Sequence, residues 1–222
     1  MTRSASAART RSGEKATTAK PAEQARSVAT REKLIETSIV GFSRVGYDGY
    51  SSRMIAADSG VHQALIAYHF GNKLGLWKAC LLRMSQDLRE HLASRNFEGS
   101  DDVTRLKIWC EEFIRHNSRR PQLQAMAIDA VGRNDGRFEW VLEAFGHAAH
   151  ESWRALIISA QSAGRFVSGD PGMLLNIFLG AAIRIYVMAP ETEYNLGRSP
   201  FDPDFVEEHV RTCMALFFRD EP

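Results

Sequence analysis

The residues best suited to binding chemistry lie in one short stretch, SSRMIAADSGVHQALIAYHFGNKLGLW, which runs from Ser51 to Trp77. It holds two short helix-like runs on either side of Gly60, and the second run carries amide, phenol and imidazole side chains but no acidic residue. Such groups can hydrogen-bond to base edges and to phosphate oxygens, whereas an acidic side chain would repel phosphate. The residue types of this stretch therefore favour nucleic-acid binding.

The spacing of small and apolar residues predicts that the two runs form a helix-turn-helix. Ala56 is small enough for two helices to cross closely, Gly60 suits the sharp turn, and Ile66 can dock the second helix. The alternative on spacing alone is a pair of amphipathic helices joined by an ordinary glycine turn.

The second helix of such a motif presents its first residues to the major groove, which places His62, Gln63 and Ala64 at base edges. The amide of Gln63 can pair with adenine, and the methyl group of Ala64 can pack on a thymine methyl group. Residues suited to phosphate oxygens at the far end are Tyr68, His69 and Lys73. The alternative for Tyr68 and His69 is packing against the preceding helix.

This segment resembles the DNA-binding head of the TetR-type bacterial transcriptional regulators. The matching residues are GYDGYSSRMIAADSGV followed by YHFGNK, and the resemblance covers roughly Glu32 to Trp77. It implies DNA contacts from Ser51, Arg53, Gln63, Ala64, Tyr68 and, through phosphate, Lys73. Ala67 stands where the family commonly has Tyr, and His62 stands where it often has Ser. The first departure removes a phosphate contact, and the second removes the usual hydroxyl cap of the recognition helix.

The whole chain is predicted to be all-α with about nine helices, because apolar residues recur at helical spacing and no β-type alternation appears. Thr30 and Ser51 are expected to cap helices, and Gly46 is expected to end one. The predicted spans are 30–46, 52–59, 63–70, 73 to beyond 92, 103–117, 122–132, 138–164, 171–189 and 203–218.

Composition marks residues 1–29 as a disordered basic arm, and the resemblance implies a DNA-binding domain over 30–77 and a ligand-binding and dimerisation domain over 78–222. Residues 1–90 hold 14 Lys and Arg against 8 Asp and Glu, while the remainder is acidic. A basic first part joined to an acidic second part suggests a polyanion-binding end on a body with another task. The arm either follows a nucleic-acid backbone or is a solubilising tail.

The resemblance implies that the body binds an unknown small-molecule effector and dimerises. Aromatic candidates for the pocket, with one methionine as filler, are Trp109, Phe113, Met126, Trp140, Phe145 and Trp153. Candidates for the homodimer interface are Gly180, Ala182, Phe205, Val210 and Phe217. The alternative for both sets is burial inside the protomer. His147 and His150 have a metal-ligand spacing, but no third ligand is evident, so no metal is predicted.

These features predict a ligand-responsive DNA-binding regulator, most simply a repressor that binds a palindromic operator in double-stranded DNA as a homodimer. A small-molecule-binding helical protein with a vestigial DNA-binding head is the alternative. No phosphate-binding loop or activated nucleophile is present, so neither enzymatic activity nor a cofactor is expected. Three widely spaced cysteines and the lack of a membrane-length apolar segment predict a cytoplasmic protein without membrane association.

Overall fold

The computed structural model describes residues 14–95, 99–131, 133 and 135–219, and it describes side chains for these except at 14–22 and 147–149. Within these residues the chain is all-helical, as predicted, with eleven α-helices, one π-helical turn and an isolated β-bridge between Phe166 and Phe218. The helices are α1 (Glu14–Gly49), α2 (Ser52–Ser59), α3 (Ala64–Phe70), α4 (Lys73–Ala93), α5 (Asp102–Arg119), α6 (Gln122–Ala130), α7 (Arg137–Val141), α8 (His147–Ser162), α9 (Pro171–Val187), α10 (Ala189–Leu196) and α11 (Pro203–Phe217).

The number of helices exceeds the prediction for two reasons. The segment predicted as one helix over 138–164 is divided, because the π-helical turn Leu142–Gly146 separates α7 from α8. The Pro-rich segment after α9 was predicted to be a break, yet it forms α10. Its proline occupies the first turn, where a missing backbone N–H costs nothing.

The first helix begins earlier than predicted. It starts at Glu14 rather than Thr30, so residues 14–29 are helical and do not belong to a disordered arm, while residues 1–13 lie outside the described residues. The hydroxyl of Thr30 donates to the Arg26 carbonyl (2.9 Å) within the helix and does not cap its start. Ala, Lys, Glu and Gln favour helix even without apolar residues to bury, which explains the extension. The regular helix bends at Gly46, where an end was predicted, with φ at +75°.

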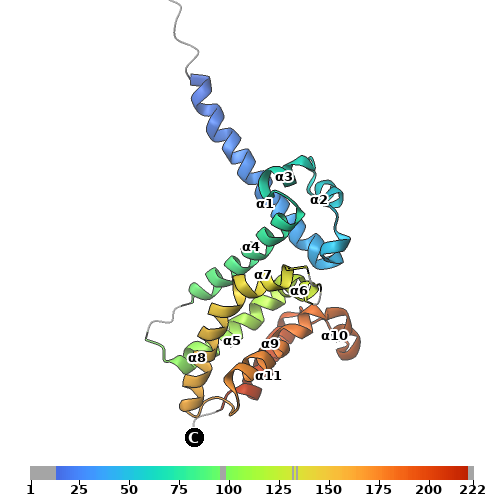
Figure 1. Cartoon of the computed structure of the whole chain (residues 1–222). Helices are drawn as coiled ribbons and strands as arrows, with labels where there is room; N and C mark the ends of the chain where they lie inside the picture. The colour runs from blue at the N-terminus through green and yellow to red at the C-terminus, as the bar shows by residue number, and fades with distance from the viewer. Residues whose placement is uncertain (1–13, 96–98, 132, 134, 220–222) are drawn as a thin grey trace, which may run out of the picture.

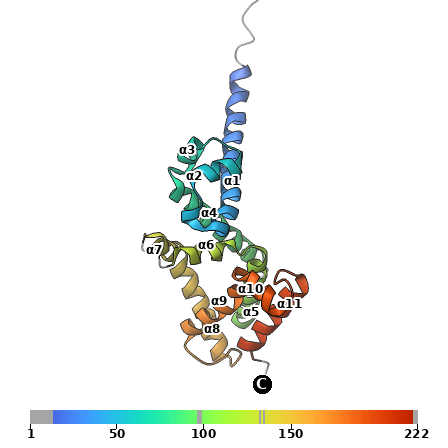
Figure 2. The same ribbon diagram turned by 90° about the vertical axis from the view of Figure 1, so that its right-hand side faces the viewer.

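Figures 1 and 2 show α1 to α4 forming a head at one end of the molecule and the remaining helices forming a body at the other. The head has its own buried cluster, which extends past residue 77 along α4 to Met84 and takes in Met126 and Ala130 from α6. A second cluster fills the body between α5, α8, α9 and α11. Helix α4 therefore starts in the head and ends against the body.

Among the described residues no single helix is long and apolar enough to cross a membrane. Helices α9 and α10 reach that length and apolarity only as a pair, which is bent by 82°.

Candidate DNA-binding surface and effector pocket

The turn between α2 and α3 is built from local signals. The side chain of Ser51 accepts a hydrogen bond from the Met54 backbone N–H (3.3 Å) and so caps α2, as predicted. Gly60 ends α2 in the left-handed conformation (φ +60°), which favours glycine. Ala56 and Ile66 are both buried in the head cluster, as the helix-turn-helix spacing requires.

The imidazole of His62 lies just before α3, whose N-cap residue, Gln63, makes no side-chain cap bond. The Nδ1 atom of His62 accepts a hydrogen bond from the backbone N–H of Ala64 (3.3 Å). An accepting Nδ1 is unprotonated, so in the neutral ring the proton lies on Nε2, which remains a donor. His62 thus holds the backbone N–H of the first residue of α3 from outside the helix and keeps a donor nearby.

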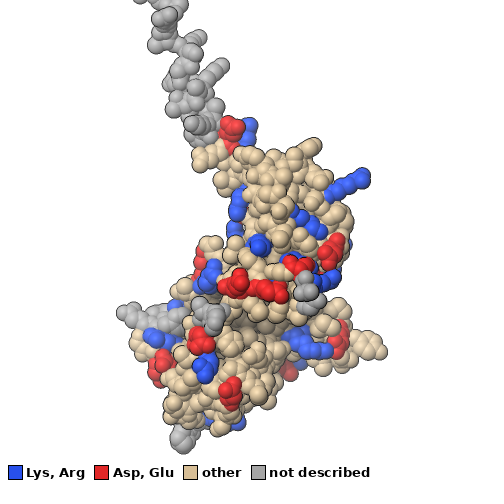
Figure 3. All heavy atoms as spheres, in the orientation of Figure 1, with Lys and Arg blue, Asp and Glu red and all other residues tan. Residues whose placement is uncertain are grey.

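The exposed side of α3 carries most of the predicted contact residues. Gln63, Ala64 and Tyr68 are exposed, and Ala64 and Tyr68 are four residues apart on one helix face. The Tyr68 side chain is 75% exposed, so it is not packed against the preceding helix. Its ring meets the half-buried ring of His69 edge-on, at 4.8 Å between centroids. Arg53 of α2 is also exposed, whereas the hydroxyl of Ser51 is engaged in its cap. In Figure 3 the surface over α3 carries no charged side chain, while a basic side chain projects outward beside it, at α2.

Lys73 differs from the other predicted DNA contacts because its ammonium group is engaged inside the head. Its Nζ donates to the Tyr47 carbonyl oxygen (2.9 Å) and lies 4.1 Å from the centre of the Tyr47 ring. Burial lowers the pKa of this ammonium group. A phosphate contact from Lys73 stays a prediction that requires this side chain to turn outward.

Helix α3 is fixed to the start of α4. Asn72 caps α4 by accepting from the Gly75 backbone N–H (2.8 Å). A side chain at Gly75 would collide with the carbonyl oxygen of Phe70, the last residue of α3, so glycine permits this close approach. The end of α3 is thus packed directly against the start of α4.

The head meets the body at a buried arginine that sequence reasoning missed. Arg137 of α7 is 2% exposed, and its guanidinium carbon lies 4.1 Å from the centre of the Tyr47 ring. Its Nε donates to the carboxylate of Asp135 (2.7 Å). Asp129 of α6 accepts from the backbone N–H of Tyr47 (3.0 Å), directly after the bend at Gly46. The sequence signal was weak: an arginine after an Asp-Gly turn, with aromatic neighbours.

The far end of α4 is held to α5 and α11 by a second charged cluster. Glu112 of α5 accepts from His91 (2.7 Å) and pairs with Arg95, both on α4 or directly after it. Arg115 bridges Glu112 to both carboxylate oxygens of Glu207 on α11. Burial alone would raise the pKa of Glu112, but the His91 hydrogen bond and the Arg95 charge hold it below its usual value.

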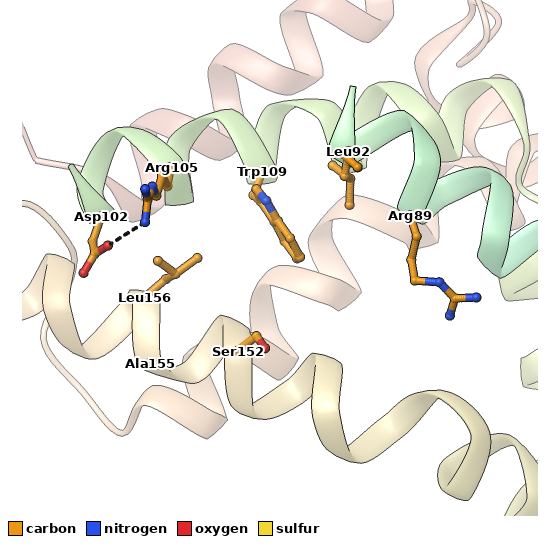
Figure 4. A pocket seen from close by; sticks show the side chains of 9 residues that line it. Arg89, Leu92, Asp102, Arg105, Trp109, Ser152, Ala155 and Leu156 are labelled. Atoms are coloured by element: carbon orange, nitrogen blue, oxygen red, sulfur yellow. Dashed lines mark ion pairs between the residues drawn. The ribbon is translucent and has the colours of Figure 1, made fainter. Parts of the chain in front are cut away.

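A pocket of about 660 Å³ lies between α4, α5 and α8. Figure 4 shows Trp109 extending from α5 toward α8, with Arg89 of α4 at one end and Arg105 with Asp102 at the other. Its lining residues are Arg89, Leu92, Ala93, Asp102, Arg105, Trp109, Ser152, Ala155 and Leu156. Such a volume suits a small organic ligand.

The six predicted pocket residues are not brought together. Trp109 lines the pocket, and Trp153 and Phe113 stand behind it in the body cluster, with 4.9 Å between the Trp109 and Trp153 centroids. Met126, Trp140 and Phe145 instead pack in or against the head cluster. Aromatic content alone cannot separate a pocket wall from the joint between head and body.

Four of the five predicted dimer-interface residues are buried inside the protomer. Ala182 is completely buried, and Phe205, Val210 and Phe217 are nearly so; of the predicted set, only Gly180 is exposed. These four side chains are buried within the protomer and offer little surface, so the homodimer interface stays a prediction. Helix α9 does have an exposed stripe at spacings of four and three, formed by Met173, Ile177 and Gly180.

The possible metal pair is only partly visible. The side chain of His147 lies outside the described residues, whereas that of His150 is half-buried. Over the described part of the chain, no group of three or more His, Cys, Asp or Glu side chains could hold a metal ion.

Comparison with known proteins identifies the head. The family model for bacterial regulatory proteins of the tetR family matches residues 34–80. BetI 2 of Chromohalobacter salexigens, an HTH-type transcriptional regulator, is 31% identical over 97 residues, covering 44% of this chain and 46% of that protein. RaaS of Mycobacterium tuberculosis, an HTH-type transcriptional regulatory protein, is 34% identical over 129 residues, covering 58% and 52%. The chain matches only about half or less of the length of these curated relatives.

Solved structures share the fold over nearly the whole chain. AibR in complex with isovaleryl coenzyme A and operator DNA has a TM-score of 0.70 at 19% identity, covering 85% of this chain and 98% of AibR. HlyIIR, a hemolysin II transcriptional regulator, has a TM-score of 0.62 at 17% identity, covering 88% and 99%. At these identities the likeness establishes the fold alone.

A capped α2, a left-handed Gly60 and an exposed α3 define a helix-turn-helix head of the DNA-binding class. The match over residues 34–80 shows that this head is similar to the part of the tetR family of bacterial regulatory proteins that the family model describes.

Proposed function

We propose that the protein is a transcriptional repressor that binds a palindromic operator as a homodimer and is released by a small-molecule effector. The exposed face of α3 carries this proposal, because Gln63, Ala64 and Tyr68 are presented on a helix that is otherwise docked into a rigid head. Two such heads on a two-fold axis would read half-sites about 34–36 Å apart or a multiple of that spacing. The structure of AibR in complex with isovaleryl coenzyme A and operator DNA supports the proposal, because there a protein of this fold binds both a small molecule and DNA.

The dimer contact is proposed for the exposed sides of α9 and α11 rather than their buried sides. Met173, Ile177 and Gly180 form the stripe on α9, and Leu216 is exposed on α11. Exposed apolar side chains in a row are typical of a surface that another protein covers.

Helix α4 offers the path between effector and operator. It contributes Leu76 and Trp77 to the head core and Arg89, Leu92 and Ala93 to the pocket wall. A ligand can shift the operator affinity only if it binds the two positions of α4 with different affinity. Such a ligand would move α3 as well, because Asn72 and Gly75 join the two helices closely.

The test is selection of bound sequences from random DNA with the full chain, followed by titration of the recovered sites. Gln63→Ala should relax base preference at one position per half-site and cost about 1–3 kcal/mol there. Gln86→Ala is the matched control, because Gln86 lies on α4, outside α3, and bonds only to Glu90 among the described residues. Failure of the wild-type chain to enrich any sequence would refute DNA recognition, and an unchanged Gln63→Ala preference would remove that residue from base reading.

A further inference from the structure

We propose that the pocket between α4, α5 and α8 takes an organic anion with an apolar portion, and that Arg89 binds its anionic group. This inference rests on the proposed function, because it names the class of effector that the pocket would receive. The pocket is apolar in its middle, where Leu92, Trp109 and Leu156 come from three different helices (Figure 4). An aliphatic portion placed there would be covered by α4, α5 and α8 together.

The charged groups lie at the two ends of this apolar middle. At one end Arg105 and Asp102 face each other at 3.7 Å, so their charges largely offset each other. At the other end stands Arg89, whose Nη1 donates to the hydroxyl of Ser85 (3.1 Å). A guanidinium carries five N–H donors, and this bond to a neutral partner is its single polar contact within the described part of the chain. The lining therefore has one positive charge without an acidic partner.

That arrangement selects against other ligand classes. A cationic ligand would need an acidic or aromatic cage, but the only carboxylate of the lining is the one facing Arg105. A neutral apolar ligand would leave the exposed Arg89 guanidinium to water and would gain nothing from its charge. A carboxylate or a phosphate satisfies the planar guanidinium with two parallel hydrogen bonds.

Arg89 also occupies the position from which ligand binding would reach the head. It lies on α4, sixteen residues after Lys73, and shares that helix with Trp77 in the head core. An anion held by Arg89, with its apolar portion against Leu156 of α8, would tie α4 to α8 across the pocket. The ligand contact with α4 would then depend on where α4 stands relative to α8, which is the differential interaction that coupling requires.

The test uses ten-carbon probes that differ in their head group, all below the concentrations at which they form micelles. Binding of decanoate, decanol, decyltrimethylammonium and decanoyl-coenzyme A to the full chain would be measured by calorimetry. Decanoate, decanoyl-coenzyme A or both should bind more tightly than the neutral and cationic probes. A preference for decanoate would identify a carboxylate ligand, and a preference for the coenzyme A ester would identify a phosphate-bearing one. Equal binding of all four, or binding of none, overturns the proposal.

Variants at one position assign the anion contact. Arg89→Gln should weaken binding of the preferred anion about 10–100-fold, and Arg89→Lys should restore part of it, because the positive charge returns. Arg154→Gln is the matched control, since Arg154 is an exposed arginine of α8 that does not line the pocket. An Arg89→Gln variant that binds the anion as tightly as Arg154→Gln overturns the assignment.

Operator binding without any probe is measured on the same samples. If the wild-type chain binds operator but prefers no anion, the ligand class proposed here is refuted and the proposed function stands. If the chain prefers the anion through Arg89 but binds no DNA selectively, the proposed function is refuted and the ligand class stands.

Discussion

Arg137 offers a sharp test of how the head is held on the body, through the replacement Arg137→Met. The guanidinium is buried against Tyr47 and bonds to Asp135, while its Nη1 and Nη2 atoms lack hydrogen-bond partners. Those two atoms do lie within ion-pair range of carboxylates, 3.5 Å from Asp129 and 3.9 Å from Asp48. Methionine keeps an apolar stem of similar length and removes the charge with its donors.

Arg137→Met is not expected to destabilise the fold strongly, because two contributions oppose each other. Losing the cation–π contact with Tyr47 costs about 0.5–2 kcal/mol. The pair with Asp135 is partly exposed and contributes less than about 1 kcal/mol. Against this, the variant relieves two buried donors without partners, each of which costs about 1–3 kcal/mol. Because losses of up to about 3 kcal/mol oppose gains of about 2–6 kcal/mol, the free energy of unfolding should fall by no more than about 1 kcal/mol and should otherwise stay the same or rise.

Arg137→Ala should behave differently because it also removes the stem. Large-to-small replacement at a buried site leaves a cavity and costs about 2–5 kcal/mol. Urea denaturation of both variants measures the difference. Arg133→Met is the control, since Arg133 pairs with the same carboxylates of Asp48 and Asp129 from an exposed position and should change stability by less than about 1 kcal/mol.

DNA binding supplies the second measurement on these variants. Without the Arg137 guanidinium, the head loses a contact that fixes its orientation relative to the body. Arg137→Met should therefore weaken operator binding several-fold while the chain remains at least as stable as before. If Arg137→Met and Arg137→Ala are destabilised equally and strongly, the buried guanidinium itself supports the fold, and the reasoning above is refuted.

Three further predictions concern pH, assembly and the N-terminal residues. Burial lowers the pKa of His116 from 6.5 to about 4, so the unfolded chain takes up this proton first as the pH falls. Stability should therefore drop between pH 6.5 and 4 by up to about 3 kcal/mol, and His116→Gln should flatten that part of the stability curve. Ala182→Asp should unfold the body, as circular dichroism would show, whereas Ile177→Asp on the exposed stripe should leave a folded protein that sediments as a monomer. Deleting residues 1–29 should flatten the dependence of log K for operator on log salt, by about 0.9 for each lost phosphate contact, and identical slopes would assign them no DNA contact.

The head could be predicted from sequence because its signals are local. Ser51 and Gly60 bracket α2 at the predicted residues, and their roles depend on neighbours a few positions away. A cap and a left-handed glycine act through backbone groups within one turn, so their effect survives in almost any tertiary setting. The start of α1 was misplaced for the opposite reason, since helix extension past Thr30 follows from propensity alone and has no boundary signal.

The body could not be predicted at the level of single residues. Helix α9 is apolar on nearly every side, so its sequence does not reveal that Ala182 faces the protomer core while Ile177 faces outward. The pocket wall joins Arg89 to Leu156 across 67 positions of sequence, and no periodicity reports which distant helices meet. Predicting the pocket from aromatic residues also combined Trp109 with Trp140, which stands at the head joint.

The geometry of α4 sets how small an effector-driven shift needs to be. A helix of 21 residues is about 30 Å long at about 1.5 Å per residue, so a tilt of about 5° about one end displaces the other by about 2–3 Å. Contacts at the two ends of α4 resist such a tilt, with Arg137 5.6 Å from the centre of the Trp77 ring near the head and Glu112 paired with Arg95 beyond Ala93. A ligand beside Arg89 lies between them, closer to the Glu112 cluster. A small shift of α4 beside Arg89 would therefore become a larger displacement at the distant end of the helix, next to α3. There, a displacement of a few ångströms is enough to remove Gln63 from hydrogen-bond distance of a base.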